Sequence, residues 1–91
     1  MNRNPNSRQC EIARVMTKSC ITNVQIREEL HKLSDSEWDV QCTILDGLLK
    51  EHNASFDKAF PVAVDDFRTI GASNGVNEAT LFVAYMEWKN N

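Results

Sequence analysis

The chain has 91 residues, of which 42% are hydrophobic and 25% are charged, and its formal net charge is −3. This length suits one compact domain, and this composition is typical of a globular rather than a disordered chain. No apolar run approaches the roughly 20 residues that span a bilayer, and the polar start of the chain does not resemble a signal peptide. We therefore expect a cytoplasmic protein with no membrane segment, a flexible N-terminus over residues 1–6 and a single helical domain over residues 7–91.

The two parts of the chain carry opposite charge. Residues 1–33 contain six Lys and Arg residues against three acidic ones, whereas residues 34–91 contain four against ten. Such an asymmetry can mark a surface that faces a partner, or the two parts can simply dock on each other. Both interpretations stay open from the sequence.

The first third of the chain has helical periodicity. From Ser7 to about Cys20 the apolar residues fall on one face, and a second helical segment extends from Val24 to Leu33. Thr22 followed by Gln25 has the spacing of a capping box, which marks a helix start. The pattern leaves open whether residues 7–33 form one helix or two.

The clearest helix is expected from about Asp35 to His52, with Ser34 and Glu37 as its capping box. Its expected inner face consists of Trp38, Cys42, Leu45, Leu48 and Leu49, widened by Val40 and Ile44. Its expected outer face consists of Asp35, Asp39, Asp46 and Lys50. So wide an apolar face predicts the central helix of a small bundle, and Gly47 would allow a neighbouring helix to approach closely.

The segment between this helix and the last one is less regular. After the expected helix end at Asn53 and an ambiguous stretch over 54–60, Pro61 begins a new segment. Residues 62–70 favour a helix, although residues 61–64 could instead be a short strand. Turn-forming residues follow over 71–75, and Asn77 is a suitable N-cap for a final helix to about Asn90.

The final helix contains seven apolar residues among the eight from Leu81 to Trp88. A strand over 80–88 is the competing prediction, but the Asn77 cap and the alanines favour a helix. Leu81, Ala84, Tyr85 and Trp88 would face the domain, which leaves other apolar residues towards water. Because a small domain has little spare core, this excess predicts a surface for a protein partner or a second copy. The expected contact residues are Phe82, Val83, Met86 and Trp88.

No constellation of residues predicts chemistry. The cysteines and histidines are spaced about ten residues apart, unlike the close pairs that bind zinc, and a reduced, structural role is expected for them. The sequence also lacks a phosphate-binding glycine loop and a nucleophile motif. We predict no catalytic residues, no metal, no cofactor and no small-molecule substrate, and hence no enzyme.

Residues 67–81 resemble a helix-turn-helix DNA-binding motif, with Gly71 in the first helix, Gly75 in the turn and Val76 after it. The resemblance implies a regulator that uses residues 67–88 together with basic residues of the first helices. The implied DNA contacts are Arg68, Asn77, Glu78, Thr80, Lys89, Arg8, Arg14 and Lys18. The chain departs from the motif at Asn74, a usually apolar position, and its second helix is poor in the basic residues that bind phosphates.

Taken together, the sequence predicts an all-α fold, a small bundle of four or five short helices. The function expected is protein–protein interaction: a regulatory, inhibitory or adaptor module that binds a partner or itself through the C-terminal helix. The alternatives are a helix-turn-helix regulator, disfavoured by charge, and an acidic mimic of nucleic acid that presents Asp35, Asp39 and Asp46. In length and asparagine content the chain is similar to small accessory proteins of phages and mobile elements, although no motif supports that likeness.

Overall fold

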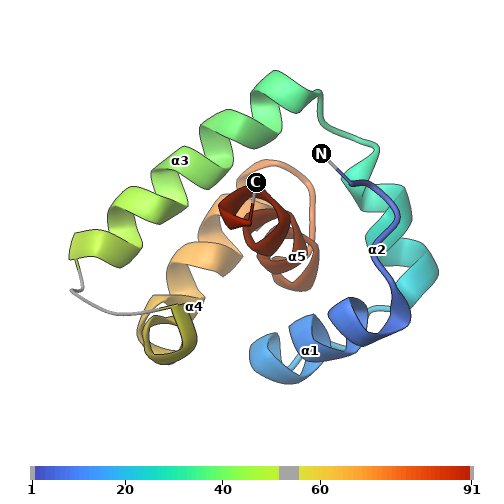
Figure 1. Ribbon diagram of the computed structural model, residues 1–91, viewed down its shortest axis with the longest axis horizontal. Coiled ribbons are helices and arrows are strands. Elements are labelled where there is room, and N and C mark those ends of the chain that lie inside the picture. Colours follow the sequence, from blue (N-terminus) through green and yellow to red (C-terminus); the bar gives the residue numbers. More distant parts are fainter. Residues whose placement is uncertain (1, 52–55, 91) are drawn as a thin grey trace.

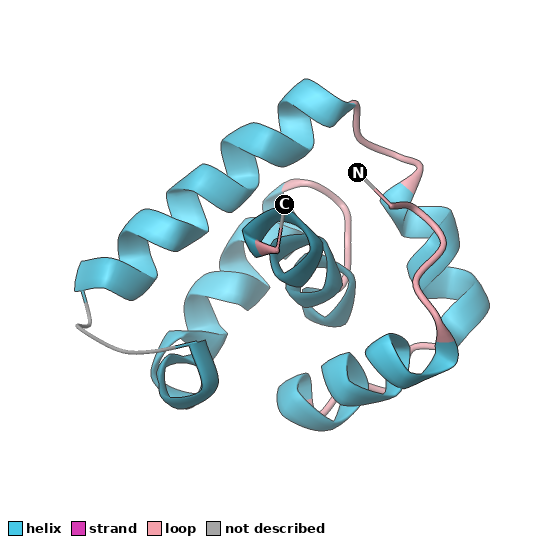
Figure 2. Cartoon of the chain, in the orientation of Figure 1, coloured by secondary structure: helices cyan, strands magenta, loops and turns pink. Residues whose placement is uncertain are grey.

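The structure, a computed structural model, describes residues 2–51 and 56–90, with the side chains of residues 2–51 and 65–90. Its helices are α1 (Ser7–Thr17), α2 (Asn23–Leu30), α3 (Asp35–Glu51), α4 (Phe56–Ser73) and α5 (Glu78–Lys89). The described residues contain no strand (Figure 2). The predicted all-α class is therefore confirmed, and the strands considered over 61–64 and 80–88 are wrong.

The predicted capping residues start the helices. The Thr22 hydroxyl accepts from the Gln25 N–H at 3.1 Å, and the Gln25 side chain accepts from the Thr22 N–H at 3.0 Å. Ser34 and Glu37 exchange the same two bonds, at 3.2 and 3.0 Å. The Asn77 side chain accepts from the Ala79 N–H at 2.8 Å. Each side chain satisfies a backbone donor that the helix start leaves unpaired.

Residues 7–33 form two helices. Lys18 adopts the left-handed conformation, with φ of 54°, and its N–H donates back to the carbonyls of Arg14 and Val15. This turn ends α1 at Thr17, before the expected end at Cys20.

Helix α5 lies at the centre of the molecule, and each of the other four helices contacts it (Figure 1). Helices α1 and α3 lie on opposite sides of α5 and do not contact each other. The prediction that the helix over 35–52 is central is therefore wrong. A helix that is apolar on all sides is the one that a small bundle must enclose.

The expectation that Phe82 and Val83 face water is also wrong. Their exposed fractions are 1% and 0%, and residues 79–85 are buried without a break. Phe67 of α4 lies against Phe82 and Tyr85, with ring centroids 6.0 and 6.1 Å apart. Phe82 and Val83, which the sequence suggested were surplus apolar surface, are therefore buried in the chain's own core.

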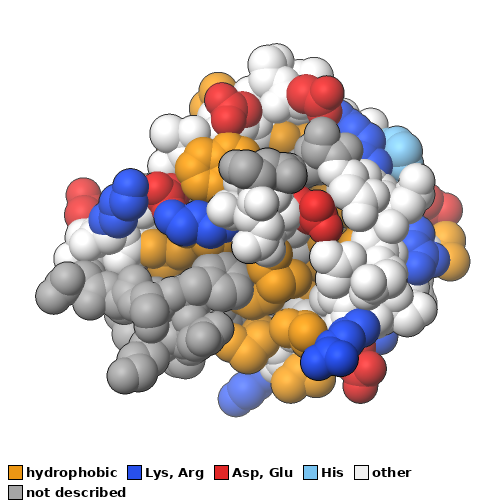
Figure 3. Space-filling model, viewed as in Figure 1, with side chains coloured by type: hydrophobic (Ala, Val, Ile, Leu, Met, Phe, Trp, Pro, Cys, Tyr) orange, Lys and Arg blue, Asp and Glu red, His pale blue; other side chains and the backbone are white. Residues whose placement is uncertain are grey.

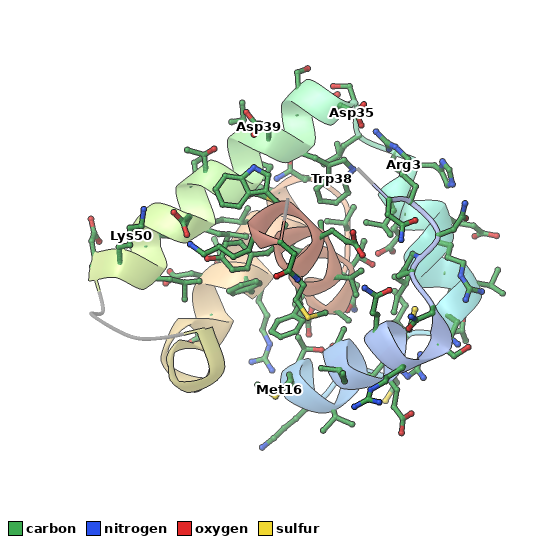
Figure 4. The ribbon with its side chains drawn as sticks, viewed as in Figure 1. Arg3, Met16, Asp35, Trp38, Asp39 and Lys50 are labelled. Carbon is green, nitrogen blue, oxygen red and sulfur yellow. The ribbon has the colours of Figure 1, made fainter. Side chains whose placement is uncertain are left out.

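The segment before α1 is attached to α2, although residues 1–6 were expected to be flexible. Arg3 donates to the carbonyl oxygens of Leu30 and Leu33, the latter at 2.7 Å, and pairs with Asp35 at 2.6 Å. Figure 4 shows Arg3 beside Asp35, where α2 gives way to α3. The Arg27 guanidinium donates to the carbonyl of Pro5, a buried residue. These bonds satisfy carbonyls at the end of α2 and hold Arg3 and Pro5 in place.

Helix α4 begins at Phe56, earlier than the segment predicted from Pro61, and it continues to Ser73 into the expected turn. The turn to α5 is tight: the Val76 N–H donates to the Gly71 carbonyl at 2.9 Å, and Gly75 has φ of 71°. A Cβ on Gly71 would lie 2.8 Å from the Val76 carbonyl oxygen. The helix that was predicted to begin at Asp35 was expected to end at His52 and Asn53, and these two residues lie outside the described part of the chain.

Truncation of the Phe82 side chain should make the protein easier to unfold. We expect Phe82→Ala to lower the free energy of unfolding by about 3–5 kcal/mol, because it leaves a cavity beside Phe67 and Tyr85. The measurement is urea unfolding followed by circular dichroism. Val24→Ala is the matched control, since Val24 is 59% exposed, and should change stability by less than about 0.5 kcal/mol. A Phe82→Ala protein as stable as this control would contradict the central position of α5.

The two helical glycines should respond to alanine in opposite directions. A Cβ on Gly47 meets nothing within 4 Å, so Gly47→Ala should stabilise the protein by up to about 1 kcal/mol through helix propensity. Gly71→Ala should destabilise it, because the clash is with backbone that cannot rotate away. Melting temperatures of the two variants check this pair. Equal shifts in melting temperature would contradict the close approach of Gly71 to the Val76 carbonyl oxygen.

Candidate protein-binding surface

Asp46 lies on the inner face of α3 with the buried apolar residues Trp38, Cys42, Leu45 and Leu49. Its side chain, expected on the outer face, is buried with an exposed fraction of 9%. One carboxylate oxygen accepts from the Tyr85 hydroxyl at 2.8 Å and from Lys89 Nζ at 2.9 Å, and the other pairs with Lys50 at 2.9 Å. A buried carboxylate is tolerated only with such partners, and α5 supplies two of them one turn apart.

The pKa values of the groups in this cluster are shifted in the directions expected of a structural contact. Hydrogen bonds from Lys89 and Lys50 hold the pKa of the Asp46 carboxyl well below its usual range. Burial, and then the Asp46 carboxylate, raises the pKa of Tyr85 above its usual range. Burial also raises the pKa of the neighbouring Cys42 thiol to about 12, so that it stays protonated and a poor nucleophile.

A second bond joins α3 to the end of α5. The Trp88 indole N–H donates to Asp39 at 2.8 Å, and its ring stacks on Tyr85 at a centroid distance of 6.0 Å. Trp88 and Met86 are half-buried and pack against the core. Of the four residues predicted to bind a partner, these two reach the surface. Figure 3 shows hydrophobic side chains near the middle of one face, where Figure 1 places α5.

The side of α3 opposite this inner face exposes apolar residues. Val40 and Ile44 have exposed fractions of 53% and 46%, so the prediction that they widen the inner face is wrong. Exposed Thr43 and Gly47 share this side, and no described atom outside its own helix lies within 4 Å of a Cβ built on Gly47. Two acidic residues that are also exposed, Glu37 and Glu51, flank it. We call the side formed by Glu37, Val40, Thr43, Ile44, Gly47 and Glu51 the α3 face.

Helix α1 carries a second exposed apolar pair, in a basic setting. Ile12 and Val15 have exposed fractions of 41% and 68%, one helical turn apart. Arg8 and Lys18 are exposed on either side of them. We call the surface formed by Arg8, Glu11, Ile12 and Val15 of α1, together with Lys18 just after its end, the α1 face. The remaining large exposed hydrophobic side chain in the described part of the protein is Val24, which stands alone on α2.

The residues implied in DNA contact are not brought together. Thr80 is buried and donates to Glu29 at 2.7 Å, Asn77 caps α5, and Lys89 binds Asp46. Glu78 accepts from Ser19 and pairs with Arg68 at 3.5 Å, and Arg14 donates to Asn23. Arg8 and Lys18 are left exposed on α1. Helices α4 and α5 do form a helix-turn-helix, but its second helix is enclosed and cannot enter a groove.

No protein-family model, curated protein or solved structure matches this chain. Within the described residues, no cluster of three or more His, Cys, Asp or Glu side chains could hold a metal ion. No helix in the same residues is both long and apolar enough to cross a membrane.

The Asp46 cluster should make stability depend on acid pH. Because the pKa of Asp46 is lowered on folding from its ordinary 3.8, its stabilisation is complete above about pH 4 and is lost as pH falls through the folded value. Asp46→Asn, which keeps the shape, should be less stable than the parent protein at pH 7, and the difference should shrink at pH 3 or below. Urea unfolding at pH 7, 4 and 3 measures this. A difference that does not change with pH would contradict the assigned charge.

Proposed function

We propose that the protein is a small protein-binding module and that its docking surface is the α3 face. One observation carries this proposal: Val40 and Ile44 are exposed one helical turn apart, beside a glycine that no other part of the described chain approaches. Scattered exposed apolar residues are ordinary, but an apolar stripe along one helix is the geometry that another helix recognises.

The α3 face also defines the chemistry of the partner. Gly47 would let a partner helix come close, since no Cβ separates the two backbones there. The carboxylates of Glu37 and Glu51 at the ends of the stripe favour a partner with basic residues around its apolar contacts. These charges lie at the rim, where they speed association and select partners more than they add affinity.

The charge asymmetry of the chain supports a partner-facing surface. Among the described residues, Arg3–Asp35 is the one ion pair that joins residues 1–33 to the acidic remainder. Arg8 and Lys18 of the basic part and Glu37 and Glu51 of the acidic part are exposed, so these charges are available to a partner.

Neither nucleic-acid alternative gains support from the described side chains. A DNA regulator needs an accessible recognition helix, and α5 is enclosed. An acidic mimic needs its carboxylates on one open face. Here Asp46 is buried, Asp35 pairs with Arg3, and Asp39 accepts from Trp88.

A tagged pull-down from source-cell lysate tests the proposal after nuclease treatment. The parent protein should retain a protein partner, and Val40→Ser/Ile44→Ser should lose it while keeping its circular dichroism spectrum and melting temperature. The control is Val24→Ser, which removes an equally exposed apolar residue from α2 and should retain the partner. Retention by both variants, or recovery of nucleic acid that disappears with nuclease, would overturn the docking surface.

A further inference from the structure

We propose that the partner of the α3 face is the α1 face of a second copy of this chain, so that copies associate head to tail. The inference depends on the proposed function, since it uses the same docking surface, and it names the occupant. Charge, spacing and the positions of the two helices support this contact.

On both faces an apolar pair lies between two charged residues, and the charges of the two faces are opposite in sign. On α1 the apolar pair Ile12 and Val15 lies between Arg8, four residues before it, and Lys18, three residues after it. On α3 the pair Val40 and Ile44 lies between Glu37, three residues before it, and Glu51, seven residues after it. Even with Glu11 counted, the α1 face carries one net positive charge and the α3 face two negative charges.

Both relative directions of the two helices bring a basic end against an acidic end, and the helix dipoles favour the antiparallel one. With the helices antiparallel, Lys18 lies opposite Glu37, and the long side chain of Arg8 reaches across Gly47 towards Glu51. Antiparallel helices also place opposite dipole ends together, which favours this direction over the parallel one. The apolar pairs then meet between the two charged ends.

A single chain cannot make this contact within itself. Helices α1 and α3 lie on opposite sides of α5 and do not touch (Figure 1). The complementary faces can therefore meet only between copies. Because the two surfaces differ and point in different directions, the contact is heterologous and produces a ring or an open chain of copies.

A symmetric dimer fits the charges less well. Two α3 faces would bring the carboxylates of one copy against those of the other. Two α1 faces would do the same with Arg8 and Lys18. Like charges at close range disfavour both arrangements, whereas the mixed contact pairs each charged end with its opposite.

The test is a complementation experiment by analytical ultracentrifugation. The parent protein should form species larger than dimers as its concentration rises. Ile12→Ser/Val15→Ser and Val40→Ser/Ile44→Ser should each be monomeric when alone, with unchanged circular dichroism spectra. Mixed in equal amounts, the two variants should form a 1:1 dimer and nothing larger, since each supplies one intact face.

Charge reversal provides a second test that leaves the apolar residues in place. Arg8→Glu and Glu51→Arg should each weaken self-association by about two- to fivefold, the effect of one exposed ion pair. The double variant Arg8→Glu/Glu51→Arg should restore it, because the pair is reversed rather than removed. Failure of restoration would contradict the antiparallel contact.

The outcomes separate this inference from the proposed function. A parent protein that stays monomeric, or an α1 variant that still self-associates, would overturn the head-to-tail contact. If the α3 variant then still loses a protein partner in the pull-down, the docking surface stands and its occupant is another protein. If it loses nothing, both proposals fail.

Discussion

The enclosure of α5 is the constraint on which the rest of the structure depends. Its apolar residues surround the helix axis, so no single neighbour could bury them, and four helices must each supply one face. Its polar N-terminus is satisfied within the same shell, since Glu29 of α2 accepts from the Asn77 N–H at 2.8 Å and from the Thr80 hydroxyl. Each surrounding helix thus has one face committed to α5 and another towards solvent.

Within that shell, the apolar residues of α3 set its rotation about its own axis. Trp38, Cys42, Leu45 and Leu49 are buried, and turning Val40 and Ile44 inwards would expose that larger set. Facing Asp46 to water would also leave the Tyr85 hydroxyl buried without its acceptor, a cost of roughly 1–3 kcal/mol. The three donors around Asp46 therefore favour the same rotation as the hydrophobic effect. The candidate docking surface is the side of α3 that this rotation leaves exposed.

The sequence predicted the local features well and the long-range ones poorly. Capping signals at Thr22, Ser34 and Asn77 depend on residues three or fewer positions apart, so the helix starts could be found without knowledge of the fold. The burial of Asp46 depends on its partners Tyr85 and Lys89, some forty residues away. The burial of Phe82 and Val83 depends on helices from both ends of the chain. Periodicity within one segment contains no information on either point.

The core and the proposed docking surface use different residues, so substitutions in one need not affect the other. The core is completed by α5 and the inner faces of its neighbours, and Val40 and Ile44 keep about half of their surface exposed. Substitutions there remove little buried area from the folded chain, so natural selection can alter the outer residues without loss of the fold. Apolar residues at such positions, one turn apart and bordered by charge, contribute little to stability. The proposed contact with another molecule would give these residues a role that the fold does not require.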